Sequence, residues 1–237
     1  MRILKFITSL LLLLIWFTSN AQDKKNKFLP SEVLFATDVV GLGKTLFTDE
    51  TRLEFHSKVD FHQYYLAGSF GINKINPSSD VFDYSSEGTF FRVGPHVNFM
   101  PYNKHRSSIF FGIMYARSSF KDNINYFQSD AGWGDQNLTY SNSDLKARWF
   151  EANMGINVKI LGPLYLGYTL RFKFSKKLSG YENLVPLEIP GFGQADKGNQ
   201  FGFNYYIIYK LRFRDKPIPN RPLKIRENNE ETPPQRK

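Results

Sequence analysis

Residues 200–213 read QFGFNYYIIYKLRF and carry the pattern that decides the fold. Every odd position from Phe201 to Phe213 holds an apolar or aromatic side chain, whereas the even positions mix Gly, Asn, Tyr, Ile, Lys and Arg. Because successive side chains of a strand point to opposite faces, this period of two predicts a β-strand with one apolar face. That face is long and far more aromatic than a soluble core requires.

The same alternation recurs upstream and predicts seven further strands. It is clear at residues 148–160, 164–174 and 91–99, and weaker at 53–61, 64–72, 109–120 and an opening segment from about Val33 that runs at most to Phe47. An even number of antiparallel strands, each of ~9–13 residues, is typical of a membrane barrel. We therefore predict an all-β fold, a closed antiparallel eight-stranded transmembrane β-barrel.

The lengths of the links between these strands alternate. Short links are expected at residues 62–63, 100–106 and 161–163, and long links at 74–86, 121–146 and 175–199. Membrane barrels keep short turns on the periplasmic side and longer loops outside, so the rhythm predicts this arrangement, with 121–146 as a solvated, mobile loop. The first link, near residues 48–51, breaks the rhythm unless the first strand ends near Gly41.

Periodicity alone does not decide which face lies inside. A soluble lipocalin-like barrel points its apolar face inward around a ligand, whereas a membrane barrel points it toward lipid. An export signal favours the membrane: basic Arg2 and Lys5 precede the apolar run 10–17, and small residues follow at 19–21. Tyrosines near the strand ends favour it too, because aromatic girdles lie at both membrane interfaces.

With QFGFNYYIIYKLRF at 200–213, ILGPLYLGY at 160–168 and a signal ending in NAQ, the chain resembles the small eight-stranded outer-membrane β-barrel proteins of Gram-negative bacteria, including families without an assigned function. The resemblance covers about residues 33–213. It implies a fold and a location, the cell outer membrane, and it transfers no catalytic residue. Such barrels often end at a terminal aromatic residue, which Phe213 would be, but here a tail follows.

The expected organisation has four parts. Residues 1–21 form a signal peptide, 22–32 an N-terminal periplasmic segment, 33–213 the barrel, and 214–237 a disordered, basic, proline-rich periplasmic tail. The absence of cysteine excludes disulfides, lipoprotein anchoring and Cys-zinc sites. The formal net charge of +9 falls to about +4 when the signal peptide and the tail are left out, which is modest for a nucleic-acid-binding protein, and export argues further against that function.

The face opposite the apolar one is expected to line the barrel interior and carries both signs of charge. Eight strands enclose an interior that side chains can fill, and charges buried there must be paired. We expect a structural ion-pair network, and the excess of basic groups leaves open a narrow anion-favouring path. The expected members of the ion-pair network are Arg52, Glu54, Lys58, Asp60, Arg92, His96, Glu151, Arg171 and Lys173.

Enzymatic chemistry finds little support. The four histidines show no metal-ligand spacing, no phosphate-binding loop is present, and no cofactor is expected. We therefore expect a non-enzymatic, monomeric envelope protein that contacts outer-membrane lipid. A narrow solute pore and a lipid-modifying barrel enzyme with a serine–histidine–carboxylate site stay open as alternatives. An unidentified extracellular ligand would meet the outer loops at Tyr126, Trp133, Asp135 and Tyr140, and the tail would meet any periplasmic partner.

One hairpin allows a register to be predicted. With Leu161, Gly162 and Pro163 as a three-residue turn, Ile160 faces Leu164 and paired residue numbers sum to 324. This register keeps one face apolar throughout. It places Glu151 opposite Lys173, with Arg171 on the diagonal, so Glu151 is expected to form an interior ion pair rather than act as a catalytic acid.

Overall fold

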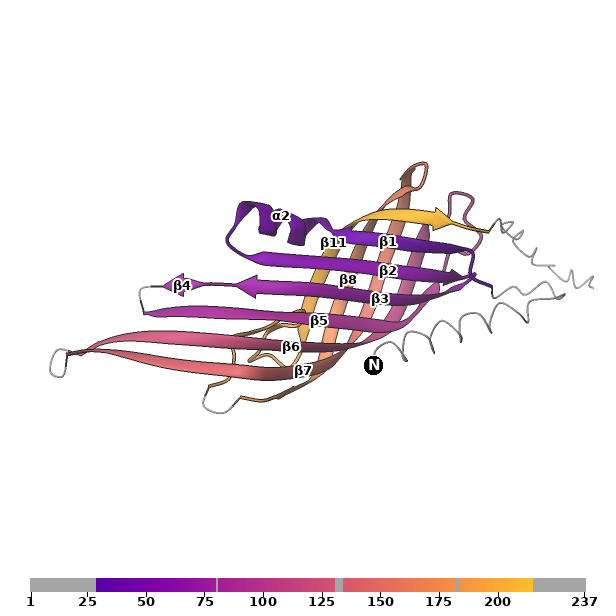
Figure 1. The fold of residues 1–237 in the computed structure, drawn as a ribbon. Coiled ribbons are helices and arrows are strands. Elements are labelled where there is room, and N and C mark those ends of the chain that lie inside the picture. The colour runs from indigo at the N-terminus through magenta and orange to yellow at the C-terminus, as the bar shows by residue number, and fades with distance from the viewer. Residues whose placement is uncertain (1–28, 80, 131–133, 182–183, 215–237) are drawn as a thin grey trace, which may run out of the picture.

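The computed structural model describes residues 29–79, 81–130, 134–181 and 184–214. The expected signal peptide, residues 22–28 of the N-terminal segment, and the tail beyond Arg214 lie outside the described residues. The described part is all-β apart from one short helix (Figure 1). Its elements are β1 (Glu32–Asp38), α2 (Val39–Phe47), β2 (Thr51–Phe61), β3 (Tyr64–Ile75), β4 (Ser78–Ser79), β5 (Phe82–Asn98), β6 (Ser108–Asp130), β7 (Gly134–Leu161), β8 (Leu164–Ser179), β9 (Glu188–Ile189), β10 (Gly193–Gln194) and β11 (Gln200–Arg212).

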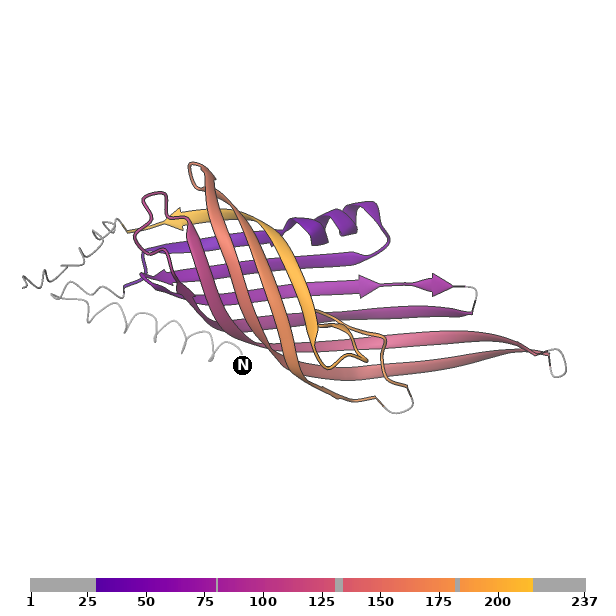
Figure 2. The ribbon, with the colours of Figure 1, turned by 180° about the vertical axis from the view of Figure 1, so that it is seen from behind.

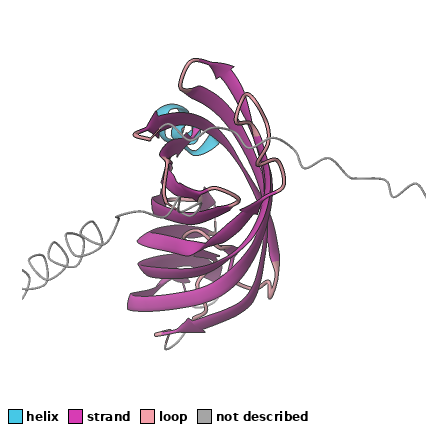
Figure 3. Cartoon of the chain, turned by 90° about the vertical axis from the view of Figure 1, so that its right-hand side faces the viewer, coloured by secondary structure: helices cyan, strands magenta, loops and turns pink. Residues whose placement is uncertain are grey.

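The long strands pair into one antiparallel ring. Within the described residues the order is β1, β2, β3, β5, β6, β7, β8 and β11, and the pairing of β11 with β1 completes the circuit. Viewed from one end, the sheet curves around an interior (Figure 3). The two-residue strand β4 pairs only with β5, and β9 pairs with β10 as a separate small sheet. No helix among the described residues has the length and apolar character needed to cross a membrane.

The two ends of the ring differ. At one end, on the right of Figure 1, the links 62–63, 99–107 and 162–163 join β2 to β3, β5 to β6 and β7 to β8. We call this the short-turn end; the ends of β1 and β11 also lie there, where Phe213 N donates to Ser31 O at 3.3 Å. The opposite, long-loop end carries α2 and the projecting parts of β5, β6 and β7 (Figure 2).

The first strand is shorter than its longest expected extent, because a helix replaces its second half. β1 ends at Asp38, whose carboxylate accepts a hydrogen bond from Gly41 N at 3.0 Å and so caps α2. Thr45 then donates to Gly41 O at 3.0 Å. The link from β1 to β2 is therefore long, and the exception to the expected alternation of link lengths disappears.

The expectation of a solvated loop at residues 121–146 was wrong. β6 continues to Asp130 and β7 begins at Gly134, so the segment is a two-stranded extension of the sheet beyond the ring. Its pairs are mostly polar, such as Asn125 opposite Thr139. Apolar burial in this extension is confined to a small cluster around Ile124, so its sequence lacks the continuous apolar alternation that reveals the other strands. β3 and β5 likewise extend further than expected, to Ile75 and back to Phe82.

The β7–β8 register follows the predicted sum over most of its length. Glu151 lies opposite Lys173, Asn153 opposite Arg171 and Val158 opposite Leu166. The predicted contact of Ile160 with Leu164 was wrong, because Leu161 pairs with Leu164 across a two-residue link. An irregularity between Lys159 and Leu161 absorbs the extra residue, so the tighter turn does not reverse the faces.

Polar and charged side chains fill the ring, and apolar side chains cover its outside. The buried charged residues include Glu54, Arg92, Glu151, Arg171 and Lys210, whereas Phe55, Leu66 and Ile207 on the outer face are about half exposed. Apolar interior clusters lie at the two ends. One contains Leu34, Tyr165 and Ile208 near the short-turn end, and another contains Phe90, Phe120, Trp149 and Phe192 toward the long-loop end.

Candidate functional site

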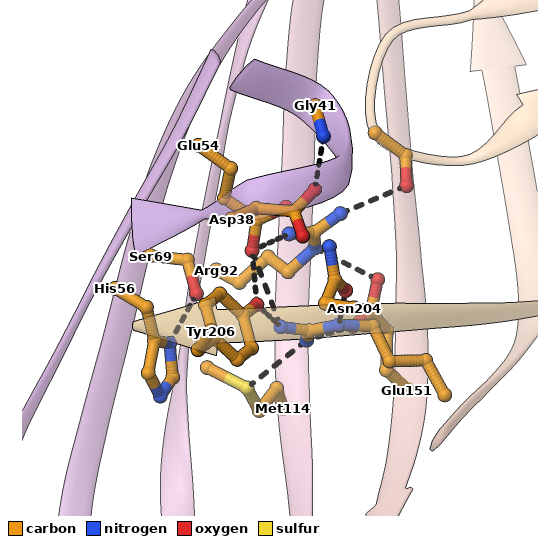
Figure 4. Close-up of polar contacts among 12 residues, drawn as sticks. Asp38, Gly41, Glu54, His56, Ser69, Arg92, Met114, Glu151, Asn204 and Tyr206 are labelled. Carbon is orange, nitrogen blue, oxygen red and sulfur yellow. Dashed lines mark hydrogen bonds and ion pairs between the residues drawn. The ribbon is translucent and has the colours of Figure 1, made fainter. Parts of the chain in front are cut away.

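Four charged side chains form a ring-spanning network inside the structure (Figure 4). Arg92 Nη1 lies 2.8 Å from Glu54 Oε1, and Arg92 Nε lies 2.9 Å from Glu151 Oε1. Arg171 repeats the pattern, with Nη2 3.2 Å from Glu54 Oε1 and Nη1 3.0 Å from Glu151 Oε2. Two guanidinium groups and two carboxylates thus close a cycle of zero net charge.

Neighbouring polar groups add further hydrogen bonds to the network. The Tyr206 hydroxyl donates to Glu54 Oε1 at 2.9 Å, and Trp149 Nε1 donates to Glu151 Oε1 at 2.8 Å. Arg171 Nε donates to Asn204 Oδ1 at 2.7 Å. Burying charges is costly unless each is paired and hydrogen-bonded, and this arrangement meets both conditions.

Strand alternation explains why these four residues meet. Glu54, Arg92, Glu151 and Arg171 lie on β2, β5, β7 and β8, and each occupies a position whose side chain points into the ring. β2 and β7 are not neighbours in the ring, so the network crosses the interior from wall to wall. The ion pairs therefore link opposite walls of the ring across its interior.

The other residues expected in the network lie elsewhere. Arg52 pairs with Glu50 at 2.9 Å and with Glu188 at 3.0 Å at the long-loop end. Lys58 Nζ lies 3.2 Å from the centroid of the Phe110 ring, a cation–π contact. Three further members are placed separately: Asp60 accepts from Ser31 Oγ at 2.7 Å, the His96 ring stacks on Phe110 at 5.0 Å, and Lys173 Nζ donates to Gly191 O and Phe192 O, each at 2.9 Å.

The long link after β8, expected as an outer loop over 175–199, instead folds into the ring. Ile189, Phe192 and Ala195 are buried, and the Phe192 ring meets that of Trp149 edge-on at 5.5 Å. Arg92 Nη2 also donates to Gly191 O at 3.0 Å. The left-handed φ of Gly191 (+80°) suits glycine, and a Cβ there would lie 2.6 Å from the Phe90 ring. We call residues 188–195 the inward loop.

A second buried ion cluster near the short-turn end escaped the sequence reasoning. Glu32 is 2 % exposed and lies within ion-pair distance of Arg106 (3.2 Å) and Lys210 (3.4 Å). Lys210 Nζ also donates to Arg106 O at 2.8 Å. This cluster was not predicted because Glu32 lies just before the expected first strand and Arg106 lies in an expected turn. The only indication in the sequence was that Lys210 occupies an even, inward-facing position of its strand.

The candidate outer-loop contacts are placed only in part. Tyr126 and Tyr140 are half-buried and pack with Phe82 and Leu184 against the cluster of Ile75, Tyr84 and Ile124. Trp133 lies outside the described residues, and for Asp135 only the backbone is described, opposite Ser129 in the hairpin.

A serine–histidine pair is present but faces a filled interior. His56 Nδ1 lies 2.7 Å from Ser69 Oγ, on adjacent positions of β2 and β3, and both side chains are buried. The His56 ring stacks on Tyr206 at 5.3 Å and on His96 at 6.5 Å. Within the described chain, no group of three or more His, Asp or Glu residues is arranged to hold a metal ion.

Comparison with known proteins supplies a family. Residues 3–216 match the family described as Domain of unknown function (DUF6048). The chain belongs to this family. The DUF6048 match takes in every strand of the ring. A search of curated proteins gives no match. The crystal structure of Acinetobacter baumannii CarO superposes with a TM-score of 0.38 and 11 % sequence identity, covering 80 % of this chain and 100 % of that chain, which is too distant to indicate fold or function.

Proposed function

We propose that this protein is an outer-membrane β-barrel with a closed interior, acting as a non-enzymatic envelope protein that presents an extended hairpin outside the cell. The observation that carries the proposal is the apolar outer face of a ring whose interior is charged. A soluble lipocalin-like barrel would have the opposite arrangement.

The height of the apolar face matches a membrane. On β8 the outward series runs from Leu164 through Leu166 and Leu170 to Phe174, where Ser175 follows with φ of +55°. Ten residue steps at ~3.4 Å, tilted by ~35–45°, span roughly 24–28 Å, close to the ~25 Å apolar band of outer-membrane barrels. Beyond Phe174 the exposed side chains are polar, so the apolar band ends there.

The hairpin formed by residues 120–145 of β6 and β7 projects beyond this band (Figure 1). In the proposed orientation the short-turn end is periplasmic, so the hairpin extends outside the cell, where it is available to a partner. Its base is held by the cluster around Tyr84 and Ile124. A projecting hairpin whose strand pairs are mostly polar supports a surface-interaction role better than an enzymatic one.

Cell fractionation and conductance test the proposal. We expect the protein in the outer-membrane fraction, with a folded form whose migration in SDS gels changes on heating. Because the ion-pair network and the inward loop fill the ring, planar-bilayer recordings should show no discrete conductance steps. Recovery as a soluble periplasmic protein would contradict the membrane proposal, and stepwise conductance would contradict the closed interior.

The hairpin should also become more stable at acidic pH. Burial raises the pKa of Asp122 above its ordinary value of 3.8, although Asn142 and Tyr84 donate hydrogen bonds to its carboxylate at 2.8 and 3.2 Å. A carboxyl group with a raised folded-state pKa stabilises the fold at pH values below its unfolded pKa. That contribution is lost as pH rises through the folded pKa.

Hydrogen exchange of residues 120–145 should therefore slow as the pH falls toward that window, after correction for the intrinsic exchange rate. Asp122→Asn is the matched control, because an amide cannot titrate, and it should remove this part of the pH dependence. Equal pH dependence in both proteins would refute the role of Asp122.

A further inference from the structure

The wall of the ring is incomplete where β1 ends early. β1 pairs with β11 only as far as Asp38 opposite Tyr206, and with β2 only as far as Thr37 opposite Phe55. Residues 51–54 of β2 and 200–205 of β11 therefore have no ladder partner on that side in the described structure. The helix α2 stands where the missing part of β1 would be (Figure 1).

The helix closes one side of this gap and leaves the other open. On the β2 side, Arg52 N donates to Thr45 Oγ1 at 2.9 Å, and a Cβ on Gly41 would lie 2.3 Å from Arg52 O. This close approach seats α2 against β2. On the β11 side, Tyr205 N donates to Asp38 Oδ1 at 3.2 Å, and Asp38 precedes the helix.

A cavity of about 330 Å³ occupies the open side, within the range of roughly 300–1,000 Å³ typical of small-ligand pockets. Val40 and Lys44 of α2 line one wall, and Phe201 and Phe203 of β11 line the other. Phe201 and Phe203 belong to the outer apolar face, where they are 81 % and 57 % exposed. The cavity thus extends from the outer surface to the buried charges.

Its lining carries both signs of charge, with more basic than acidic groups. The carboxylates are Asp38, Glu54 and Glu188, and the basic groups are Lys44, Arg52, Arg92, Arg171 and Lys173. The guanidinium groups of Arg92 and Arg171 at the inner end are already paired with Glu54 and Glu151. Lys173 differs, because no carboxylate of the described chain lies within 4.0 Å of its Nζ; it donates only to Gly191 O and Phe192 O. An ammonium has three N–H donors, so one is left for a ligand.

The outer end of the cavity is apolar on the β11 side. Phe201 and Phe203 line it there, and Val40 of α2 lies in the same lining, next to the charged side chain of Lys44. A cavity with apolar side chains at its outer end and a buried ammonium at its inner end suits a molecule with an anionic head and an apolar chain, because each part then meets its own environment.

We propose that this cavity binds the phosphate or carboxylate head of an anionic amphiphile, with Lys173 as the main contact and the apolar chain lying along Phe201 and Phe203. The site goes beyond the proposed envelope role. It depends on that role only for the source of the ligand, which in the outer membrane would be lipid.

Native mass spectrometry of the full-length protein in detergent tests the site, with dioleoylphosphatidylglycerol, oleate, dioleoylphosphatidylcholine and inorganic phosphate as probes. We expect the two anionic amphiphiles to bind more tightly than phosphatidylcholine. Lys173→Gln should weaken their binding by about tenfold or more, the loss expected for a hydrogen bond to a charged group.

A second variant is needed because Lys173 also donates hydrogen bonds to the inward loop. Loss of binding in Lys173→Gln alone would not distinguish a lost ligand contact from a folding defect. Gly202→Leu keeps the lysine and places a side chain in the cavity, where the nearest atoms are the flexible end of Lys173 at 3.3 and 3.4 Å. It should likewise weaken binding by about tenfold or more. Lys177→Gln is the matched control, because this exposed lysine lies on the same strand outside the cavity.

The outcomes separate the two proposals. Equal binding of phosphatidylcholine, or binding unchanged in both Lys173→Gln and Gly202→Leu, would overturn the site. Binding of inorganic phosphate alone would replace the amphiphile with a free anion and overturn the proposal as stated. A protein recovered as soluble that still binds oleate through Lys173 would refute the membrane location and leave the site intact.

Discussion

Replacing Glu151 by glutamine is expected to lower the free energy of unfolding by about 3–5 kcal/mol, the usual cost of removing one partner of a buried ion pair. Glu151 is 0 % exposed and accepts hydrogen bonds from Arg92, Arg171 and Trp149. The variant keeps the shape of the side chain but leaves two buried guanidinium groups with Glu54 as the single carboxylate in contact with both. The variant is therefore destabilised by an uncompensated buried charge and not by a cavity.

Urea titration of the protein folded into lipid vesicles measures this change. Asp144→Asn is the control. It breaks a 2.7 Å ion pair with Lys146 whose partners are 71 % and 46 % exposed. Exposed pairs contribute at most about 1 kcal/mol. A loss for Glu151→Gln no greater than for the control would show that the network does not stabilise the fold.

Replacing Ile207 by arginine is expected to destabilise the protein by about 2–4 kcal/mol in a bilayer, the cost of a charge on the lipid face of a barrel near the midplane. Ile207 is 49 % exposed and is the central residue of the outward-facing apolar series that runs along β11 from Phe201 to Phe213. In a protein surrounded by water, the same change on a half-exposed surface would alter stability by only ~0.5 kcal/mol. The size of the effect therefore separates the two environments.

Leu138→Arg provides the comparison. Leu138 is 41 % exposed, similar to Ile207, but lies in the projecting hairpin beyond the apolar band. Its replacement should alter the free energy of unfolding by less than about 0.5 kcal/mol. Similar values for the two variants in vesicle titrations would contradict the proposed position of the membrane.

Strand alternation is a local property of the backbone, and the sequence alone determined what depends on it. The period of two at 148–160 and 164–174 predicted two strands with one apolar and one polar face, and the structure has both strands in the predicted register from Lys159 back to Phe150. The same parity assigned Glu54, Arg92, Glu151 and Arg171 to one face. The alternating lengths of the links indicated that neighbouring strands are antiparallel.

Pairing between remote segments decided the rest. The contact of Arg171 with Glu54 joins β8 to β2, which come together only because β11 pairs with β1 and closes the ring, and no local pattern encodes it. The helix α2 forms because Asp38 caps it and Gly41 can approach Arg52, two conditions that an alternating apolar pattern does not reveal. The hairpin beyond Phe120 has only a small apolar cluster around Ile124 and no continuous apolar face, so its sequence resembles that of a loop.

The inward loop is the clearest case. Residues 188–195 look like an outer loop because they are rich in glycine and polar groups, and local reasoning sends such segments to solvent. In the structure, Phe192 fills the space beside Trp149, and the main-chain oxygens of Gly191 and Phe192 accept from Lys173. The sequence therefore determined the wall of the ring through its local alternation. Only the tertiary structure decided what fills it, because buried donors and unfilled volume are satisfied by whichever segment can reach them.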